Sequence, residues 1–497
     1  MKTGYGGLDF LKAVFLNSRQ WALIKNSLLL SSGVTLLSLV LGILLAVLLE
    51  RTNLFAHRLF KLIYFIPLLI PPYIHAIAWT QLLAKQEWAG SWFNGSWFKI
   101  HSLQGAIFVL TLAYFPFITL MTMSGLKLVN QHLEEASLIH HGPLKTIKSV
   151  TLPLVTPHIF AGAIFVFIFA LVNFSVPDIL RVSVYPVEIF VQFSAFYNER
   201  AATLLSLPLI LIAVTLIFLQ KRHMKERSYI NLGGSRERKH WLNLRPMVNG
   251  LVFLFCLTLF TLSIFLPVIV LLKAAGPFSN YVKSFSSSKE QIGYSILLAF
   301  LGALGSIILS FFIAYSIERR SDWKRPCMEF AAMLPFAIPA IVLGIGLIKV
   351  WNHPWTNFIY GSSAIIIFGY VARFIPFGIW TVQASLKQIP IHLEEAGALV
   401  TSRCSRILKK IVLPLCYPGL AAGLFIIFIL SLGELGTTLL IIPPGQSTLP
   451  IKIYNLMHYG ADNMVAALSL ILIGIIIVFS IIFLALYRLT GQTKAAG

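Results

Sequence analysis

Long runs of apolar residues recur along this chain, and they constrain its fold more than any other feature. Eleven runs are long enough to cross a bilayer core of about 30 Å. The runs are continuous rather than alternating, which predicts helices, because lipid leaves every backbone polar group to be satisfied within the protein. With 57% hydrophobic and only 11% charged residues over 497 positions, the composition excludes a soluble protein. We therefore predict an all-α membrane protein that crosses the bilayer many times.

We expect about eleven transmembrane helices, and the second of them should be kinked. Three prolines, Pro67, Pro71 and Pro72, interrupt that span, and a kink there is tolerable where neighbouring helices satisfy the freed backbone groups. The expected spans lie at about 28–49, 62–83, 103–126, 157–176, 203–219, 248–272, 292–317, 329–351, 362–386, 418–442 and 465–487.

Basic residues set the orientation of these spans. One side of the predicted membrane holds 25 of the 39 lysines and arginines, in loops at 50–61, 127–151, 221–245, 318–328 and 387–410 and at the C-terminus. Cytoplasmic loops are rich in Lys and Arg, so this side is cytoplasmic. The same rule explains the net charge of +21 without a nucleic-acid partner. The protein is expected in a bacterial plasma (inner) membrane, with the lipid bilayer as its surroundings.

The two halves of the chain repeat each other. Glu50-Arg51 matches Glu318-Arg319 at an offset of 268, and His132–Ala136 matches His392–Ala396 at an offset of 260. An even number of spans separates the copies, which predicts parallel repeats related by an axis along the membrane normal. We divide the chain into a first half at 1–220, a basic cytoplasmic linker at 221–247 and a second half at 248–497. The second half carries a leading span, 248–272, that residues 1–25 do not match.

One polar motif occurs in both halves, each time between apolar runs on the cytoplasmic side. It is His-Leu-Glu-Glu-Ala, followed by Leu-Pro where the chain re-enters the membrane, within loops 127–153 and 387–414. The Leu-Pro pair is expected to end the local helix on its N-terminal side. Asn130 suits a helix N-cap and Pro390 a first helical turn. Exposed acids on a short rigid helix can fit a cleft on a partner, whereas a solvated amphipathic loop is the plainer interpretation. Two copies at the same spacing favour docking.

This motif resembles the cytoplasmic loop of ABC importer permeases, and the chain resembles the fused two-half permeases of that class. The resemblance implies the type I importer fold and docking of a dimer of ATP-binding subunits on both loops. The residues that the resemblance implies for this docking are Glu134, Glu135, Ala136, Gly142, Pro153, Glu394, Glu395, Ala396, Gly397 and Pro414. The chain departs from the family pattern where Ser137 and Gly397 replace the second alanine, which affects the expected geometry of the loops.

Ionisable and amide side chains within the expected spans mark a second candidate site. A charge in the bilayer is costly and therefore a functional hypothesis by default. Asn173, Asp178, Arg373 and Glu434 are the candidates for a translocation path, and Asn173 and Glu434 occupy equivalent repeat positions. The alternative is an ion pair between Glu434 and Arg373 that only holds helices together. The stretch Gly419–Gly423 is expected to provide a small-residue face for close helix packing.

The sequence shows no ATPase domain and no group of residues typical of a catalytic, metal-binding or cofactor-binding site. It has no Gly-Lys pair and hence no phosphate-binding P-loop, so ATP hydrolysis is expected in a separate chain and this chain is not expected to be an enzyme. The resemblance is greatest to ferric iron permeases, with thiamine, phosphonate and polyamine permeases as alternatives, and it implies an external solute-binding protein. A secondary transporter driven by an ion gradient also remains open.

Overall fold

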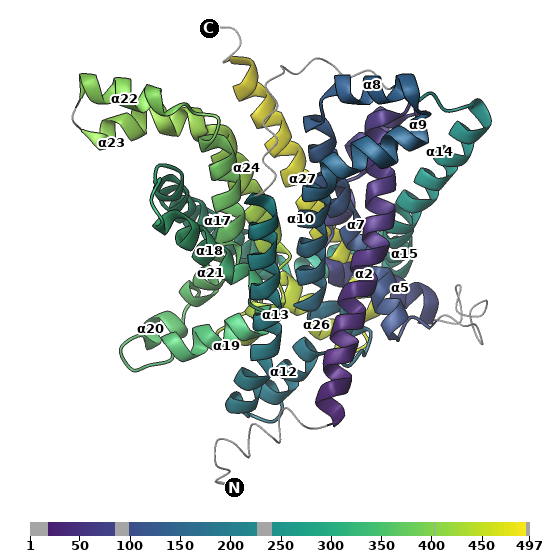
Figure 1. Cartoon of the computed structure of the whole chain (residues 1–497). Helices are drawn as coiled ribbons and strands as arrows, with labels where there is room; N and C mark the ends of the chain where they lie inside the picture. The colour runs from purple at the N-terminus through teal and green to yellow at the C-terminus, as the bar shows by residue number, and fades with distance from the viewer. Residues whose placement is uncertain (1–17, 85–98, 226–240, 402, 494–497) are drawn as a thin grey trace. The chain divides into compact units, whose positions relative to one another are not determined.

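The computed structural model describes residues 18–84, 99–225, 241–401 and 403–493 (Figure 1). Regular structure in these ranges is helical, apart from one isolated β-bridge between Thr52 and Leu242. The chain forms two compact units, residues 1–274 and 275–497. Most of the predicted basic linker, residues 226–240, lies outside the described part of the chain.

The first unit is built around three long helices, α2, α7 and α10, which pack against one another. Short helices cover both ends of this group, with α8 and α9 at one end and α12 at the other (Figure 1). Its elements are α2 (Ser18–Arg51), α3 (His57–Ile63), α4 (Ile66–Leu69), α5 (Pro72–Ala84), α7 (Leu103–Leu128), α8 (Gln131–His140), α9 (Pro143–Thr146), η2 (Ile147–Thr151), α10 (Leu152–Leu171), α11 (Ser175–Ile179), α12 (Tyr185–Ser194), α13 (Glu199–Lys225), α14 (Pro246–Phe260), η3 (Thr261–Phe265) and α15 (Leu266–Ala275).

The second unit repeats this plan around α17, α21 and α24. Its elements are α16 (Phe278–Ser286), α17 (Lys289–Glu318), α18 (Lys324–Ala337), α19 (Ala340–Trp351), α20 (Asn357–Tyr360), α21 (Ala364–Leu386), α22 (Ile391–Val400), α23 (Cys404–Ile407), η4 (Leu408–Val412), α24 (Leu413–Leu432), α25 (Gly436–Ile441), α26 (Leu449–His458) and α27 (Asp462–Thr493).

Hydrogen bonds at equivalent positions support the repeat. Ser27 Oγ accepts a bond of 3.0 Å from the N–H of Tyr185, at the start of α12. Ser295 Oγ, 268 residues further on, accepts one of 2.7 Å from the N–H of Leu449, at the start of α26. In both units, therefore, a serine near the outer end of the first long helix is bonded to the start of an equivalent short helix, α12 or α26.

Each unit contains one span that is broken rather than kinked. The helices 57–69 and 72–83 meet at 92°, and α18 and α19 meet at 104°. Prolines lie at both breaks, Pro71 in the first unit and Pro339 in the second, and proline removes a helical hydrogen bond and clashes with the preceding turn. The kink expected from sequence is therefore a complete break of the helix.

Nine helices of the described residues are long and apolar enough to cross a membrane, and the number rises to eleven when each broken pair is counted as one span. A contact within each unit supports this count. Arg51 at the end of α2 is 2.9 Å from Glu134 on α8, so both lie on one side of the membrane. Since α7 crosses between them, the broken pair must also cross. The pair Arg319–Glu394, at 2.5 Å, gives the same result for α18–α19 in the second unit.

Two spans begin earlier than the sequence predicted. We expected 157–176 and 418–442, but α10 and α24 run over Leu152–Leu171 and Leu413–Leu432. The prediction that the Leu-Pro pairs end local helix was wrong. Pro153 and Pro414 instead lie inside the continuous helical runs Pro143–Leu171 and Cys404–Leu432. A π-helical turn directly precedes each of them, at the place where proline disturbs the regular α-helical hydrogen bonding.

The span 248–272 corresponds to α14, η3 and α15, and it packs with the first unit. Phe253 contacts Phe55 at 5.4 Å between ring centroids, and Phe260 stacks on Phe60 at the same distance. The repeat in the sequence assigns this span to the second half, so the boundary between compact units and the boundary between repeats differ.

The predicted small-residue face on α24 is confirmed. A Cβ at Gly419 would lie 2.5 Å from the backbone oxygen of Thr381, and one at Gly423 would lie 2.6 Å from Ile307. The glycines therefore allow α24 to approach α21 and α17 more closely than any side chain would permit.

Candidate functional site

The two polar loops have the same construction. A ten-residue helix, α8 or α22, is followed by a four-residue helix, a five-residue π-helical turn and then the long span. The prediction that Asn130 caps α8 is confirmed, since its side chain accepts from the N–H of His132 at 3.0 Å. Pro390 is the N-cap of α22 rather than a residue of its first turn.

The first glutamate of the first loop is buried, which corrects the expectation of an exposed acid. Glu134 is 2% exposed, and its Oε1 accepts from Arg51 Nε at 2.9 Å and from Thr151 Oγ1 at 2.9 Å. Arg51 also donates to the backbone oxygen of Leu126 at 2.8 Å. Glu134 thus holds α8 to the end of α2 and to the residue just before α10.

Glu394 is its counterpart in the second loop and is buried in the same way. It accepts from Arg319 Nε at 2.7 Å and from the hydroxyl of Tyr315 at 2.7 Å; Tyr315 lies in the last turn of α17, and Arg319 is the C-cap of that helix. The position equivalent to Thr151 is Val412, which offers no hydroxyl. Glu394 is therefore held by the span before its loop, whereas Glu134 is held by residues on both sides of its loop.

The second glutamate of each loop is exposed. Glu135 on α8 and Glu395 on α22 each contact the histidine three residues earlier, at 3.4 Å and 2.9 Å, and Glu135 also accepts from the Gln131 amide at 2.6 Å. Ala136 and Ala396 lie beside them and are exposed as well. At the far end of each helix, Ile139 is 79% and Leu399 91% exposed. Each helix thus presents an acid and apolar side chains on one accessible face.

The departures from the family pattern change how each loop is packed internally. Ser137 is 3.0 Å from the hydroxyl of Thr146 and so joins α8 to α9. At the equivalent position, Gly397 lies against Ile411, since a Cβ there would be 2.8 Å from that side chain. Gly142 is the N-cap of α9 in extended backbone, with open space around it.

Glu434, the buried acid of the second unit, caps a short helix. Its carboxylate accepts from the N–H groups of Thr437 and Thr438 at 2.8 and 3.0 Å and from the Thr438 hydroxyl at 2.6 Å. Arg373 Nε lies 3.6 Å from its Oε1. The structure therefore brings Glu434 and Arg373 together at the start of α25, inside the unit.

Asn173 caps the equivalent short helix of the first unit with a neutral amide side chain. Its side-chain oxygen accepts from the N–H of Val176 at 3.0 Å, in the first turn of α11, and its amide donates to the Tyr114 hydroxyl at 3.0 Å. Asp178 lies within α11 and is half-buried. The equivalence of Asn173 and Glu434 is thus also one of local structure, since each caps the short helix after a long span.

The residues that hold the loops in place were not predicted from the sequence. Arg51 and Arg319 were noted only as markers of the repeat, although two Glu-Arg pairs at the ends of equivalent spans were a usable signal. Thr151 and Tyr315 gave no such signal, because they occupy different positions in the two halves.

Two repeated sets of spans with matched polar loops define a membrane permease made of two fused halves. A family model described as "Binding-protein-dependent transport system inner membrane component" matches residues 38–226 and again 306–493. The chain belongs to this family. It is the permease subunit of an ABC importer of the inner membrane. The family lacks catalytic activity, and ATP is hydrolysed by a separate subunit. Membership of this family rules out the alternative of a secondary transporter driven by an ion gradient.

Several relatives are ferric iron permeases at low identity. The chain is 26% identical to the Fe(3+)-transport system permease protein FbpB 2 of Haemophilus influenzae, over 90% of this chain and 87% of that protein. It is 24% identical to the ferric transport system permease protein FbpB of Actinobacillus pleuropneumoniae, over 93% and 70%. A molybdenum transport permease, ModB of Haemophilus influenzae, is 29% identical over 36% of this chain and 85% of its own length.

Proposed function

We propose that the exposed faces of α8 and α22 bind two copies of the ATP-hydrolysing subunit. The observation that carries this proposal is that both helices offer the same face, an acid with an apolar residue one turn further on. Glu135 and Glu395 are the acids, and Ile139 and Leu399 the apolar residues. Apolar side chains gathered on an accessible surface mark interaction sites.

The buried glutamates give these helices a mechanical role. Glu134 and Glu394 hold them to the ends of α2 and α17, so that a displacement of either docking helix is passed to a membrane span. When the ATP-bound subunits close, the two docking segments move together and the permease opens outward. Hydrolysis restores the inward-open state.

Charge reversal at the exposed acids tests the docking role. We expect Glu135→Lys with Glu395→Lys to leave the permease inserted but to uncouple ATP hydrolysis from transport. Asp322→Lys is the matched control, because Asp322 is a half-exposed acid in the loop between α17 and α18 and belongs to neither docking helix. Normal ATP-dependent uptake by the double variant would contradict the assignment.

We infer that the solute is ferric iron, delivered by an external binding protein. The support is the extent of the matches, since the FbpB proteins align with about 90% of the chain, whereas ModB and a 2-aminoethylphosphonate permease align with 36%. Uptake into proteoliposomes with the cognate binding protein and ATPase tests this. Radiolabelled ferric iron should accumulate, and accumulation of molybdate, phosphonate, thiamine or polyamine instead would refute it.

Asn173, Asp178, Arg373 and Glu434 remain proposals for the translocation path. Asn173 and Glu434 terminate long spans and cap the helices that follow, which gives both of them a structural task. The close contact between Arg373 and Glu434 favours a pair that fixes α21 against α25. We therefore propose that these groups shape the path by holding its walls, and the third prediction below separates this role from contact with the solute.

A further inference from the structure

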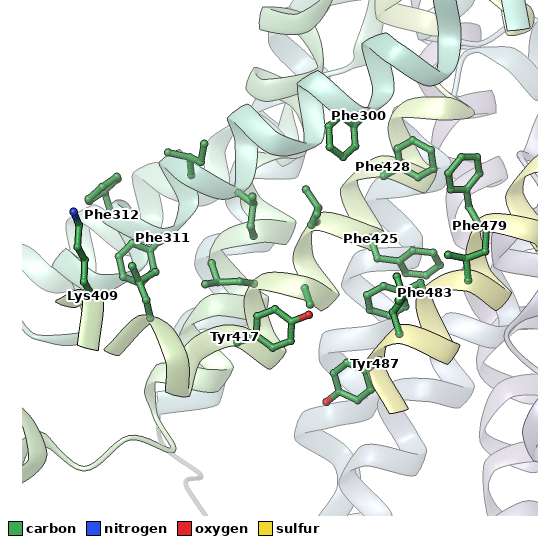
Figure 2. Close-up of a pocket in the computed structure, with 18 of the residues that line it drawn as sticks. Phe300, Phe311, Phe312, Lys409, Tyr417, Phe425, Phe428, Phe479, Phe483 and Tyr487 are labelled. Carbon is green, nitrogen blue, oxygen red and sulfur yellow. The ribbon is translucent and has the colours of Figure 1, made fainter. Parts of the chain in front are cut away.

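An apolar groove of about 810 Å³ lies in the second unit, between α17, α24 and α27 (Figure 2). Its walls include Phe312 from α17, Leu420 from α24 and Leu486 from α27. The groove is open to the surroundings of this unit, since Phe312 and Leu486 are each 56% exposed. The groove is lined by neither Glu395 of α22 nor the Glu434–Arg373 pair, and is thus a separate feature of this unit.

Two aromatic contacts join α24 to α27 along the groove. Phe425 stacks on Phe483 at 4.3 Å between centroids, and Phe428 contacts Phe479 at 4.9 Å. These contacts join the second half of α24 to the second half of α27. From there the groove runs toward the start of α24 and the end of α27, which are the cytoplasmic ends of both helices (Figure 2).

The polar groups of the lining gather at that cytoplasmic end. They are Ser405, Lys409 and the hydroxyl-bearing Tyr417 and Tyr487, while every other residue of the lining is apolar. Lys409 belongs to η4, directly before α24, and is exposed. Among the residues that the structure describes, no carboxylate forms an ion pair with Lys409. The groove thus combines apolar walls with one lysine, Lys409, among its lining residues, close to the start of α24.

We propose that this groove binds an anionic phospholipid of the cytoplasmic leaflet, with an acyl chain along the apolar walls and the phosphate at Lys409. An amphiphile has this distribution of polarity, apolar along its length and anionic at one end. Basic groups on the cytoplasmic side of membrane helices recognise anionic headgroups, and a lysine near the surface contributes about fivefold in affinity. Because η4 continues directly from α23, the lipid would join the second polar loop to α27.

Lipid retention in defined membranes tests this proposal. The full-length permease is reconstituted in phosphatidylcholine containing phosphatidylglycerol, re-extracted in mild detergent, and analysed by native mass spectrometry for bound lipid. We expect phosphatidylglycerol to be retained in preference to phosphatidylcholine. Lys409→Gln should lower this retention about fivefold, and Ala421→Trp, which fills the groove, should remove bound lipid of both kinds.

Two matched variants serve as controls. Lys410→Gln removes the neighbouring charge, which does not line the groove, and Lys148→Gln removes the charge at the repeat-equivalent position in the first unit. Both should retain phosphatidylglycerol as the unmodified protein does. Equal retention of the two lipids, or retention by Lys409→Gln equal to that of its controls, would overturn the proposal. That outcome would stand even if Ala421→Trp failed to fold.

Discussion

Arg51 and Glu134 form an ion pair at 2.9 Å in which each side chain is 2% exposed. Its counterpart in the second half, Arg319 and Glu394, is 2.5 Å apart and more accessible, at 17% and 10%. The two polar loops are thus fixed by the same chemistry at equivalent places, but the ion pair of the first loop is less accessible to water. This difference yields the first prediction.

Removing the buried arginine should cost far more than removing an exposed one. Arg51→Ala leaves Glu134 charged and buried with only Thr151 beside it, and breaking a buried pair costs about 3–5 kcal/mol. Arg319→Ala should cost less, because Tyr315 still donates to Glu394 and water reaches the site. Thermal unfolding in detergent measures both.

Arg320→Ala is the control for this series. Arg320 is 42% exposed and lies 3.7 Å from Asp322, and such surface pairs contribute at most about 1 kcal/mol. If Arg51→Ala unfolded at the same temperature as Arg320→Ala, the pair would not anchor the docking helix.

Close packing at Gly419 gives the second prediction. A Cβ there would collide with the Ser385 hydroxyl and with the backbone oxygen of Thr381, so Gly419→Ala should cost about 1–3 kcal/mol. Gly474→Ala on α27 is the control, because no atom lies within 4 Å of its Cβ position. It should leave the unfolding temperature unchanged or raise it slightly, since alanine favours helix. Equal unfolding temperatures for the two variants would contradict the packing of α24 on α21.

The third prediction concerns Glu434 and Arg373. Glu434→Gln keeps an oxygen to cap α25 but removes the charge beside Arg373, and Arg373→Gln leaves the carboxylate uncompensated. If the two form a structural pair, the double variant should be more stable than the sum of the single effects predicts, with a coupling of about 0.5–3 kcal/mol. A double-mutant cycle measured by thermal unfolding gives this value.

Uptake by the same variants separates the two roles of the pair. A structural pair predicts that transport follows stability and returns in the double variant. Additive stabilities with transport lost in all three variants would instead indicate that these side chains contact the solute.

Much of the architecture could be predicted from the sequence because hydropathy and repetition are local signals. Apolar runs gave the candidate spans, and the motif at His132 and His392 gave two matched loops. The burial of Glu134 could not be predicted in the same way, since its partner Arg51 lies 83 residues earlier in the chain. Two adjacent glutamates look alike in sequence, and only the direction in which each side chain points separates an anchor from a surface acid.

The ends of the spans were also hard to predict. Hydropathy cannot register the π-helical turns before Leu152 and Leu413, where the chain is already helical but polar. Nor does it show that Asn173 and Glu434 end one helix and cap another. These features depend on hydrogen bonds to the backbone of the next segment, which a periodic pattern does not contain.

The number of ATPase subunits that each permease retains tests the central claim most directly. We would purify the tagged permease from its native membrane in mild detergent without nucleotide and determine the stoichiometry by native mass spectrometry. The account predicts two copies for the unmodified protein, one for Glu135→Lys or Glu395→Lys alone, and none for the double variant. Two copies retained by the double variant, or none by the unmodified protein while it still transports, would contradict docking at α8 and α22.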